Sequence, residues 1–314
     1  VEVTCSTAAR GLVVVGDTLG NIHLAHDSDL KFVRHHAYRR GVTHAHLLKR
    51  HPILVTVGDG HDPRPADAQE EIHRAARMAA EKASRGREAW ASLPATATVK
   101  VWRLDRREGA PPECIRTFRV LDLKPDVADN SVVTTLAVTE ELSQIAVGMS
   151  DGALHLFRGE FHRDRGSRAQ DAAPATGLSS LASRAFTRRT VTTSLYVVTR
   201  NQALSLFTAG AKPPGVPPSG KVTLSVTGCE PGCAVVSDDD RQQLVLGTTD
   251  GVYFFTPTDR GNCCPFTGEK QLLAWFRSYL LVASLDSGHQ RRTTLSVYDL
   301  ENKFIAFSLT LSPS

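Results

Sequence analysis

The stretch SQIAVGMSDGALHLF, residues 143–157, decides between two kinds of glycine-containing loop. Apolar residues lead up to Gly148, a short polar segment carries Asp151 and Gly152, and an alternating apolar run follows. A phosphate-binding loop would need a Gly-Lys-Ser/Thr ending or a Gly-x-Gly-x-x-Gly run, each opening a helix. The sequence has neither, and strand-forming residues follow the second glycine. We therefore predict a β-hairpin, because an Asp-Gly pair suits a tight turn and glycine adopts positive φ without a Cβ clash.

The same plan recurs along the chain. LVVVGDTLGNIHL (12–24) and QLVLGTTDGVYFF (243–255) repeat the glycine spacing between apolar strands, and LYVVTRNQALSLF (195–207) repeats the plan without glycine. Two further strand pairs have longer connections: YLLVASLD with TTLSVYDL (279–300), and PILVTVGDG (52–60) with ATVKVWRLD (97–105). The residues predicted to form the structural turns are Gly16, Gly20, Gly148, Asp151, Gly152, Gly247, Asp250 and Gly251. Six strand-turn-strand units predict an all-β repeat protein.

The spacing of these units indicates the architecture. Gly16 and Gly58 are 42 residues apart, and Gly148 and Gly247 are separated by two steps of similar size. Propeller blades of four strands repeat about every 40 to 50 residues. We predict that residues 1–314 form a single β-propeller domain of WD-repeat-like, four-stranded blades, six readable here and seven in the intact protein. A β-sandwich and two smaller β domains are the alternatives.

An insert at residues 61–96 interrupts the second blade. Its central part, DAQEEIHRAARMAAEKASRGREAW (67–90), is rich in alanine and in charges of both signs, so a helix here would have only a narrow stripe of small apolar residues. Such a stripe buries little surface. We expect a disordered or partly helical loop, with a partner-binding helix as the second possibility.

Composition excludes several classes of protein. Hydrophobic residues make up 41% of the 314 residues and charged residues 22%, which is ordinary for a soluble globular protein. Since no apolar run approaches the roughly 18 residues of a membrane span, we expect no transmembrane helix. The six cysteines are spread over a chain large enough to fold without disulfides, so we expect reduced thiols and a cytosolic location.

Catalytic and metal-binding patterns are weak. Cys229 and Cys233 are spaced as Cys-x3-Cys, and Cys263 and Cys264 are adjacent, whereas structural zinc sites use regular Cys-x2-Cys knuckles. The sequence contains no Gly-x-Ser-x-Gly elbow and no grouping of Ser, His and Asp that resembles a triad. We therefore predict no catalytic residue, no metal, no cofactor and no enzyme activity.

Basic residues are concentrated in two segments. Residues 31–51 contain six basic residues, five histidines and no carboxylate, and residues 158–189 contain seven arginines and three acidic residues. Candidate contacts to acidic partners or lipid headgroups are Arg39, Arg40, Arg163 and Arg165, although a solvated charged surface is the ordinary interpretation. Nucleic acid is disfavoured, because only Phe32 and Tyr38 are available in the first segment for base stacking.

Several long segments resemble the N-terminal propeller of the vacuolar protein sorting-associated protein 11 family. They are RGLVVVGDTLGNIHL (10–24), VTHAHLLKRHPILVTVGD (42–59), VKVWRLD (99–105), AVGMSDGALHLFRGEFHRDRGS (146–167), TGCEPGCAVVSD (227–238), KQLLAWFRSYLLVAS (270–284) and VYDLENKFIAFS (297–308). The resemblance covers nearly the whole chain except the insert, which is longer than the corresponding loop of that family. Ordered segments of this length are far more specific than a single glycine turn.

The resemblance implies a non-enzymatic scaffold: the N-terminal propeller of a core subunit of the HOPS and CORVET tethers, acting in vesicle trafficking and fusion between endosomes and the lysosome or vacuole. The other HOPS and CORVET subunits would be its partners, and its location would be cytoplasmic, peripheral on late endosome, lysosome and vacuole membranes. The helical solenoid and RING domain of that family lie outside this propeller stretch. The alternative is a propeller that binds nucleic acid or an anionic membrane surface independently of a tether.

Overall fold

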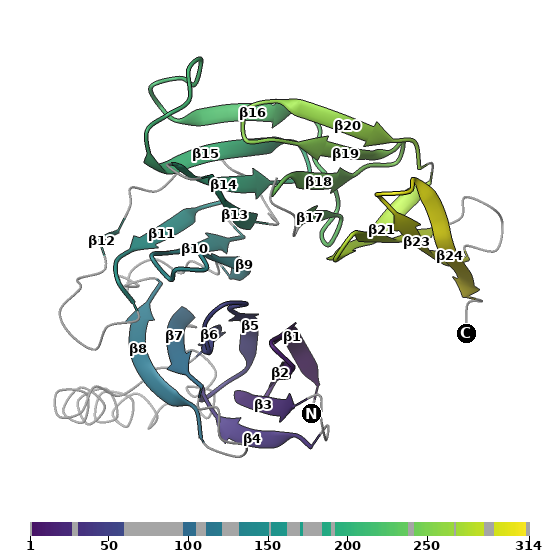
Figure 1. Cartoon of the computed structure of the whole chain (residues 1–314). Coiled ribbons are helices and arrows are strands. Elements are labelled where there is room, and N and C mark those ends of the chain that lie inside the picture. The colour runs from purple at the N-terminus through teal and green to yellow at the C-terminus, as the bar shows by residue number, and fades with distance from the viewer. Residues whose placement is uncertain are drawn as a thin grey trace, which may run out of the picture. The chain divides into compact units, whose positions relative to one another are not determined.

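The computed structural model describes residues 2–26, 31–59, 97–104, 111–120, 132–150, 152–161, 170–171, 184–189, 192–237, 242–266, 268–285 and 292–311. In these ranges every regular element is a β-strand, and the strands form six four-stranded antiparallel sheets (Figure 1). The prediction of an all-β propeller with WD-repeat-like four-stranded blades is confirmed. The insert at 61–96, Asp151, Arg163 and Arg165 lie outside the described residues, so the predictions made for them stay predictions.

Each sheet is a simple meander, because strands that follow one another in the chain also pair with one another. The first two sheets consist of β1 (Val3–Ala9), β2 (Leu12–Asp17), β3 (Asn21–His26) and β4 (Val33–His36), and of β5 (Val42–Leu47), β6 (Ile53–Asp59), β7 (Ala97–Arg103) and β8 (Glu113–Arg119). The third and fourth consist of β9 (Val133–Val138), β10 (Gln144–Met149), β11 (Leu154–Arg158) and β12 (Gln170–Asp171), and of β13 (Arg184–Arg189), β14 (Thr192–Val198), β15 (Ala203–Gly210) and β16 (Lys221–Ser225). The fifth and sixth consist of β17 (Ala234–Val236), β18 (Leu244–Gly247), β19 (Val252–Phe255) and β20 (Arg260–Cys264), and of β21 (Glu269–Phe276), β22 (Tyr279–Leu285), β23 (Thr293–Asp299) and β24 (Phe304–Leu311).

The chain divides into two compact units. The first comprises Val1–Val133 and Gly159–Ala169 and holds the first two sheets. The second comprises Thr134–Arg158 and Gln170–Ser314 and holds the other four sheets almost completely. The predictions of a single domain and of a seventh blade in the intact protein therefore stay predictions.

In the second unit, the central strands are buried on both faces. Leu195 and Val197 of β14 pack in a cluster with residues of the third sheet, whereas Tyr196 and Val198 pack in another with residues of the fifth. Successive side chains of a strand point to opposite faces, so the continuous apolar run LYVV supplies both clusters at once. A third cluster joins Val245 of β18 to Leu273, Leu280 and Val282 of the sixth sheet.

In the first unit, one apolar cluster joins the two sheets. Val14 and Ile22 of the first sheet, both fully buried, pack with Val42, Leu54 and Trp102 of the second. Gly16 lies inside β2 at this contact, and a Cβ added there would lie 2.6 Å from Cys5 Sγ and 2.9 Å from Val42 Cβ. The absence of a side chain at Gly16 thus permits the close approach of the second sheet.

The predicted turn residues fall into two groups. Gly16, Gly148 and Gly247 lie within β2, β10 and β18, not in the turns that follow, and a Cβ on Gly247 would lie 3.0 Å from Leu273 Cδ1. Gly20 and Gly152 lie in turns, with φ of 81° and 88°. Asp250 and Gly251 lie in the connection between β18 and β19, where Thr248 N donates to Gly251 O at 2.9 Å. In the pairs Gly16–Gly20 and Gly247–Gly251, the first glycine lies within a strand and against a neighbouring sheet, and the second lies in the turn that follows.

The sixth sheet has one apolar face that is exposed. Leu272, Phe276, Phe307, Leu309 and Leu311 are each between 44% and 59% exposed, whereas Leu273, Leu280 and Val282 of the same sheet are buried against the fifth.

Candidate functional site

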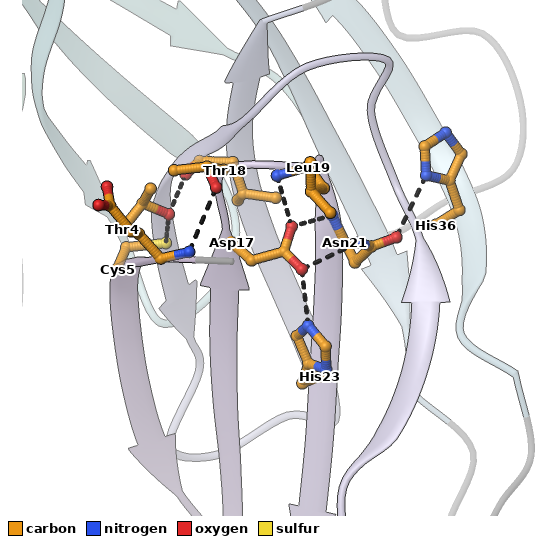
Figure 2. Close-up of polar contacts among 10 residues, drawn as sticks. Thr4, Cys5, Asp17, Thr18, Leu19, Asn21, His23 and His36 are labelled. Atoms are coloured by element: carbon orange, nitrogen blue, oxygen red, sulfur yellow. Dashed lines mark hydrogen bonds and ion pairs between the residues drawn. The ribbon is translucent and has the colours of Figure 1, made fainter.

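The turn between β2 and β3 is organised around the carboxylate of Asp17 (Figure 2). Asp17 is 2% exposed, and its Oδ1 accepts hydrogen bonds from Leu19 N at 2.9 Å and Asn21 N at 2.8 Å. Its Oδ2 accepts a bond from Asn21 Nδ2 at 2.8 Å and lies 2.8 Å from His23 Nε2. Four contacts to one buried carboxylate fix the backbone of this turn.

The charge of Asp17 is stabilised by its partners. Burial alone would raise the pKa of this carboxyl, but the hydrogen bonds from His23, Asn21 and Leu19 outweigh burial and hold the pKa well below its usual range. The same network continues outward, because His36 Nδ1 lies 3.3 Å from Asn21 Oδ1 (Figure 2). Asp17 is therefore ionised at neutral pH.

The Asp17 turn lies against the segment that leads to β5. Gly20 O accepts hydrogen bonds from Ala37 N and Tyr38 N, each at 2.9 Å. A Cβ on Gly20 would lie 2.0 Å from Tyr38 O and 2.3 Å from Arg40 O. This contact holds the backbone of the turn that carries the exposed Leu19 against the segment of Arg39 and Arg40, whose side chains are also exposed.

Tyr38 anchors the segment that carries Arg39 and Arg40 to the second sheet. Its ring is buried, and its hydroxyl lies 3.0 Å from Thr56 O and 2.7 Å from Thr56 Oγ1. Trp102 Nε1 donates to the same Thr56 Oγ1 at 2.8 Å. Lys100 Nζ donates to Ala37 O at 2.7 Å and lies 5.0 Å from the centre of the Tyr38 ring and 5.6 Å from that of Trp102. Arg39 and Arg40 therefore extend from a rigid, buried polar cluster.

The structure separates the basic residues of the segment 31–51. The strand pair β5–β6 runs from Val42↔Gly58, next to Arg40, to Leu47↔Leu54, next to Lys49 and Arg50. The two basic pairs thus lie at opposite ends of this sheet. Arg10, in the turn between β1 and β2, donates from Nη1 to Arg50 O at 3.0 Å. Arg10 therefore lies at the end of the second sheet that carries Lys49 and Arg50. No local pattern in the sequence pointed to Arg10.

Cys229 and Cys233 are at least partly enclosed thiols, whereas Cys114 and Cys263 are exposed. Cys233 is buried and its Sγ donates to Lys270 O at 3.0 Å. Burial raises the pKa of Cys229 to about 12 and that of Cys233 to about 11, with smaller contributions from neighbouring acidic groups. Within the described ranges, no three His, Cys, Asp or Glu side chains are grouped so that they could hold a metal ion. Within the same ranges, no helix has the length and apolarity needed to span a bilayer.

Comparison with known sequences identifies the family. The PEP5/VPS11 N-terminal family matches residues 90–314. The chain belongs to this family. The vacuolar protein sorting-associated protein 11 homologues of Mus musculus and Homo sapiens are each 31% identical to it over 98% of the chain, and the Arabidopsis thaliana homologue is 27% identical over 99%. The resemblance predicted from the sequence is thus confirmed. The chain spans 29%, 29% and 30% of the length of these relatives.

Solved structures share the fold at low sequence identity. The computationally designed Ika8 protein superposes with a TM-score of 0.53 at 13% identity, covering 98% of this chain and 86% of its own. Saccharomyces cerevisiae Sqt1 gives a TM-score of 0.51 at 10% identity, covering 98% of this chain and 84% of its own. At such low sequence identities the structural similarity shows a shared fold and no shared function.

Proposed function

We propose that the chain is a non-enzymatic interaction scaffold, the propeller of a HOPS/CORVET-type tethering subunit in endosome-to-lysosome or vacuole transport. The observation that supports this proposal is family membership: the 31% identity to vacuolar protein sorting-associated protein 11 homologues extends over 98% of the chain. The partners are the other HOPS and CORVET subunits, and the protein acts in the cytoplasm, peripheral on late endosome, lysosome and vacuole membranes.

The structure suits such a role because its exposed turns are held in place before any partner arrives. The Asp17 turn has its backbone fixed by Leu19 N and Asn21 N, and Tyr38 is held through Thr56. A surface that is already ordered loses little conformational entropy on binding. Rigid turns on sheets are therefore suitable docking elements for a large assembly.

The contact surface that we propose includes Arg39 and Arg40, which are exposed, together with Arg163 and Arg165. These arginines would meet acidic partner surfaces or lipid headgroups. Use of the propeller as an independent nucleic-acid-binding module is not favoured, because family membership points to a tether.

Affinity purification of the protein from its own cells, followed by detection of HOPS and CORVET subunits, tests the proposal. We expect these subunits to copurify in constant ratio through size-exclusion chromatography. Arg39→Glu with Arg40→Glu should weaken the copurification, and Lys49→Glu with Arg50→Glu, which makes the same charge change at the other end of the second sheet, is the matched control. Elution of the wild-type protein free of every such subunit would refute the tether assignment.

A further inference from the structure

The connection between β15 and β16 is a proline-rich loop that projects from the fourth sheet (Figure 1). Residues 211–220, which form this loop, have the sequence AKPPGVPPSG. Pro214, Pro217 and Pro218 are exposed, whereas Pro213 is half-buried. We propose that this proline loop is a docking element for a partner protein that presents an aromatic-lined groove bordered by carboxylates. The proposal goes beyond the tethering role above and does not depend on it.

Hydrogen bonds fold the proline loop into two successive turns. Val216 N donates to Pro213 O at 3.2 Å, and Gly220 N donates to Pro217 O at 2.8 Å. At the base of the loop, Phe207 N donates to Gly220 O at 2.8 Å. Because each proline ring also holds its own φ near about −65°, the loop has little backbone freedom to lose when a partner binds.

The two proline pairs stand in short extended segments, residues 212–214 and 216–218. A residue that precedes a proline is confined to the extended region of backbone conformation. Each segment therefore starts in the polyproline II conformation, which has three residues per turn. Gly215, with a φ of 85°, separates the two segments, and a Cβ there would meet nothing within 4 Å. The tip of the loop is thus open to a partner.

The prolines select this class of partner over other anionic surfaces. Aromatic grooves bind extended proline segments because aromatic rings pack against the pyrrolidine rings and the segment is already ordered. Insertion into a bilayer depends on large apolar side chains, and binding to single-stranded nucleic acid depends on stacked aromatic rings. The loop has no aromatic residue, and its one aliphatic side chain larger than alanine, Val216, is half-buried. These features favour a protein groove.

The charge of the loop favours carboxylates beside that groove. Lys212 and Lys221 lie on either side of the prolines, and both are exposed. Lys212 Nζ donates to Pro218 O, so the ammonium group lies next to the second proline pair. Residues 172–229 contain six basic residues and no Asp or Glu. The fourth sheet therefore has no carboxylate of its own to offset the two lysines, and an acidic partner surface is complementary to them.

A second proline turn in the chain provides a matched control. Pro231 is exposed and precedes Gly232, whose φ is 83°, as Pro214 precedes Gly215. This turn has a single proline, and the residue before that proline is Glu230. It therefore shares the backbone of the first turn of the proline loop but has neither a proline pair nor a flanking lysine.

The test is an NMR titration of isotope-labelled SH3, WW and EVH1 domains, which carry aromatic grooves for proline segments, with unlabelled residues 1–314. We expect resonances of the groove to shift in at least one domain, with a dissociation constant of about 1 mM or tighter. Pro213→Ala with Pro214→Ala, or Pro217→Ala with Pro218→Ala, should weaken this binding about tenfold through the lost ring contacts. Lys212→Gln should weaken it about threefold.

Pro231→Ala should bind within about twofold of wild type, and circular dichroism should show every variant folded. The absence of shifts in all three domains would overturn the proposal, and so would binding that neither double variant weakens. Flotation with vesicles that contain phosphatidylserine tests the lipid alternative. Vesicle binding that the proline variants weaken would assign the loop to a membrane and would also overturn the proposal. Copurification of HOPS and CORVET subunits is a separate measurement, so the tether assignment stands or falls independently.

Discussion

Replacement of Asp17 by asparagine probes the network that fixes the β2–β3 turn. Asparagine has nearly the same shape as aspartate, so its Oδ1 can still accept from Leu19 N and Asn21 N. Its amide nitrogen takes the place of Oδ2, which accepts from Asn21 Nδ2 and contacts His23 Nε2, each at 2.8 Å. The substitution therefore sets the amide donor of the new asparagine against Asn21 Nδ2 and removes the carboxylate oxygen that faces His23 Nε2.

The expected loss follows from these two contacts. A hydrogen bond to a charged group contributes about 1.5 to 3 kcal/mol, so two such bonds to a carboxylate that is 2% exposed correspond to a destabilisation of about 3 kcal/mol. For a cooperative unit with an m-value of about 3 kcal/mol per molar urea, the midpoint of unfolding falls by about 1 M.

The assay is urea unfolding at several pH values, followed by tryptophan fluorescence. Because the pKa of Asp17 is lowered in the folded state, its contribution is fully present above the unfolded pKa, about 4, and is lost as the pH falls through the folded value. Asp17→Asn should therefore destabilise the protein at pH 7, and the difference from wild type should shrink below about pH 4. A midpoint unchanged at pH 7, or a difference between variant and wild type that does not begin to shrink below about pH 4, would refute this reasoning.

Asp299→Asn is the matched control. Asp299 Oδ1 accepts from Glu301 N and Asn302 N at 2.9 Å each, and Oδ2 accepts from Asn302 Nδ2 at 3.1 Å. Since no histidine joins this second turn in the described residues, its substitution should lower the urea midpoint less than Asp17→Asn does.

Three other substitutions have defined outcomes. Thr56→Val leaves Trp102 Nε1 without its acceptor at a fully buried position, so a loss of about 1 to 3 kcal/mol in the free energy of unfolding is expected; Thr56→Ser, which keeps the hydroxyl, should recover much of it in the same urea titration. Gly20→Ala places a Cβ 2.0 Å from Tyr38 O at a φ of 81°, so thermal unfolding should begin at a clearly lower temperature, and an unchanged curve would contradict the close contact. Gly152→Val, at a φ of 88°, should cost about 1 to 2 kcal/mol, and equal stability of the variant in urea would show that this turn tolerates a branched side chain.

The repeat was predictable from the sequence because its signals are local. The run LYVV (195–198) was predicted as a strand of one repeat unit, and the structure divides its side chains between two clusters as strand alternation requires. The spacing from Gly16 to Gly58 indicated blades, and the family resemblance rested on long ordered segments. The roles of Gly16 and Gly247 differed from the expectation, because a glycine at the end of a strand looks the same in sequence whether it turns the chain or admits a neighbouring sheet.

The candidate site was only partly visible in the sequence. Arg39 and Arg40 were selected as part of a basic segment, but their separation from Lys49 and Arg50 depends on the direction of β5. Leu19 and Asp17 carried no signal, because a leucine or aspartate in a turn is common. The link between Trp102 and Thr56 spans 46 positions, and that between Arg10 and Arg50 spans 40.

By itself, the sequence determined the strands, their alternation, the number of readable blades and the family. The strands and their alternation depend on backbone preferences and apolar periodicity within windows of about 11 to 18 residues. The number of blades follows from a repeat of about 40 to 50 residues, and the family from long ordered segments of sequence. The tertiary structure alone decided that Trp102 Nε1 donates to Thr56 Oγ1, 46 positions away, and that Arg10 Nη1 donates to Arg50 O, 40 positions away. Such neighbours are set by strand register and by the packing of one sheet on the next, and contacts across 40 or more positions leave no periodic trace in the chain.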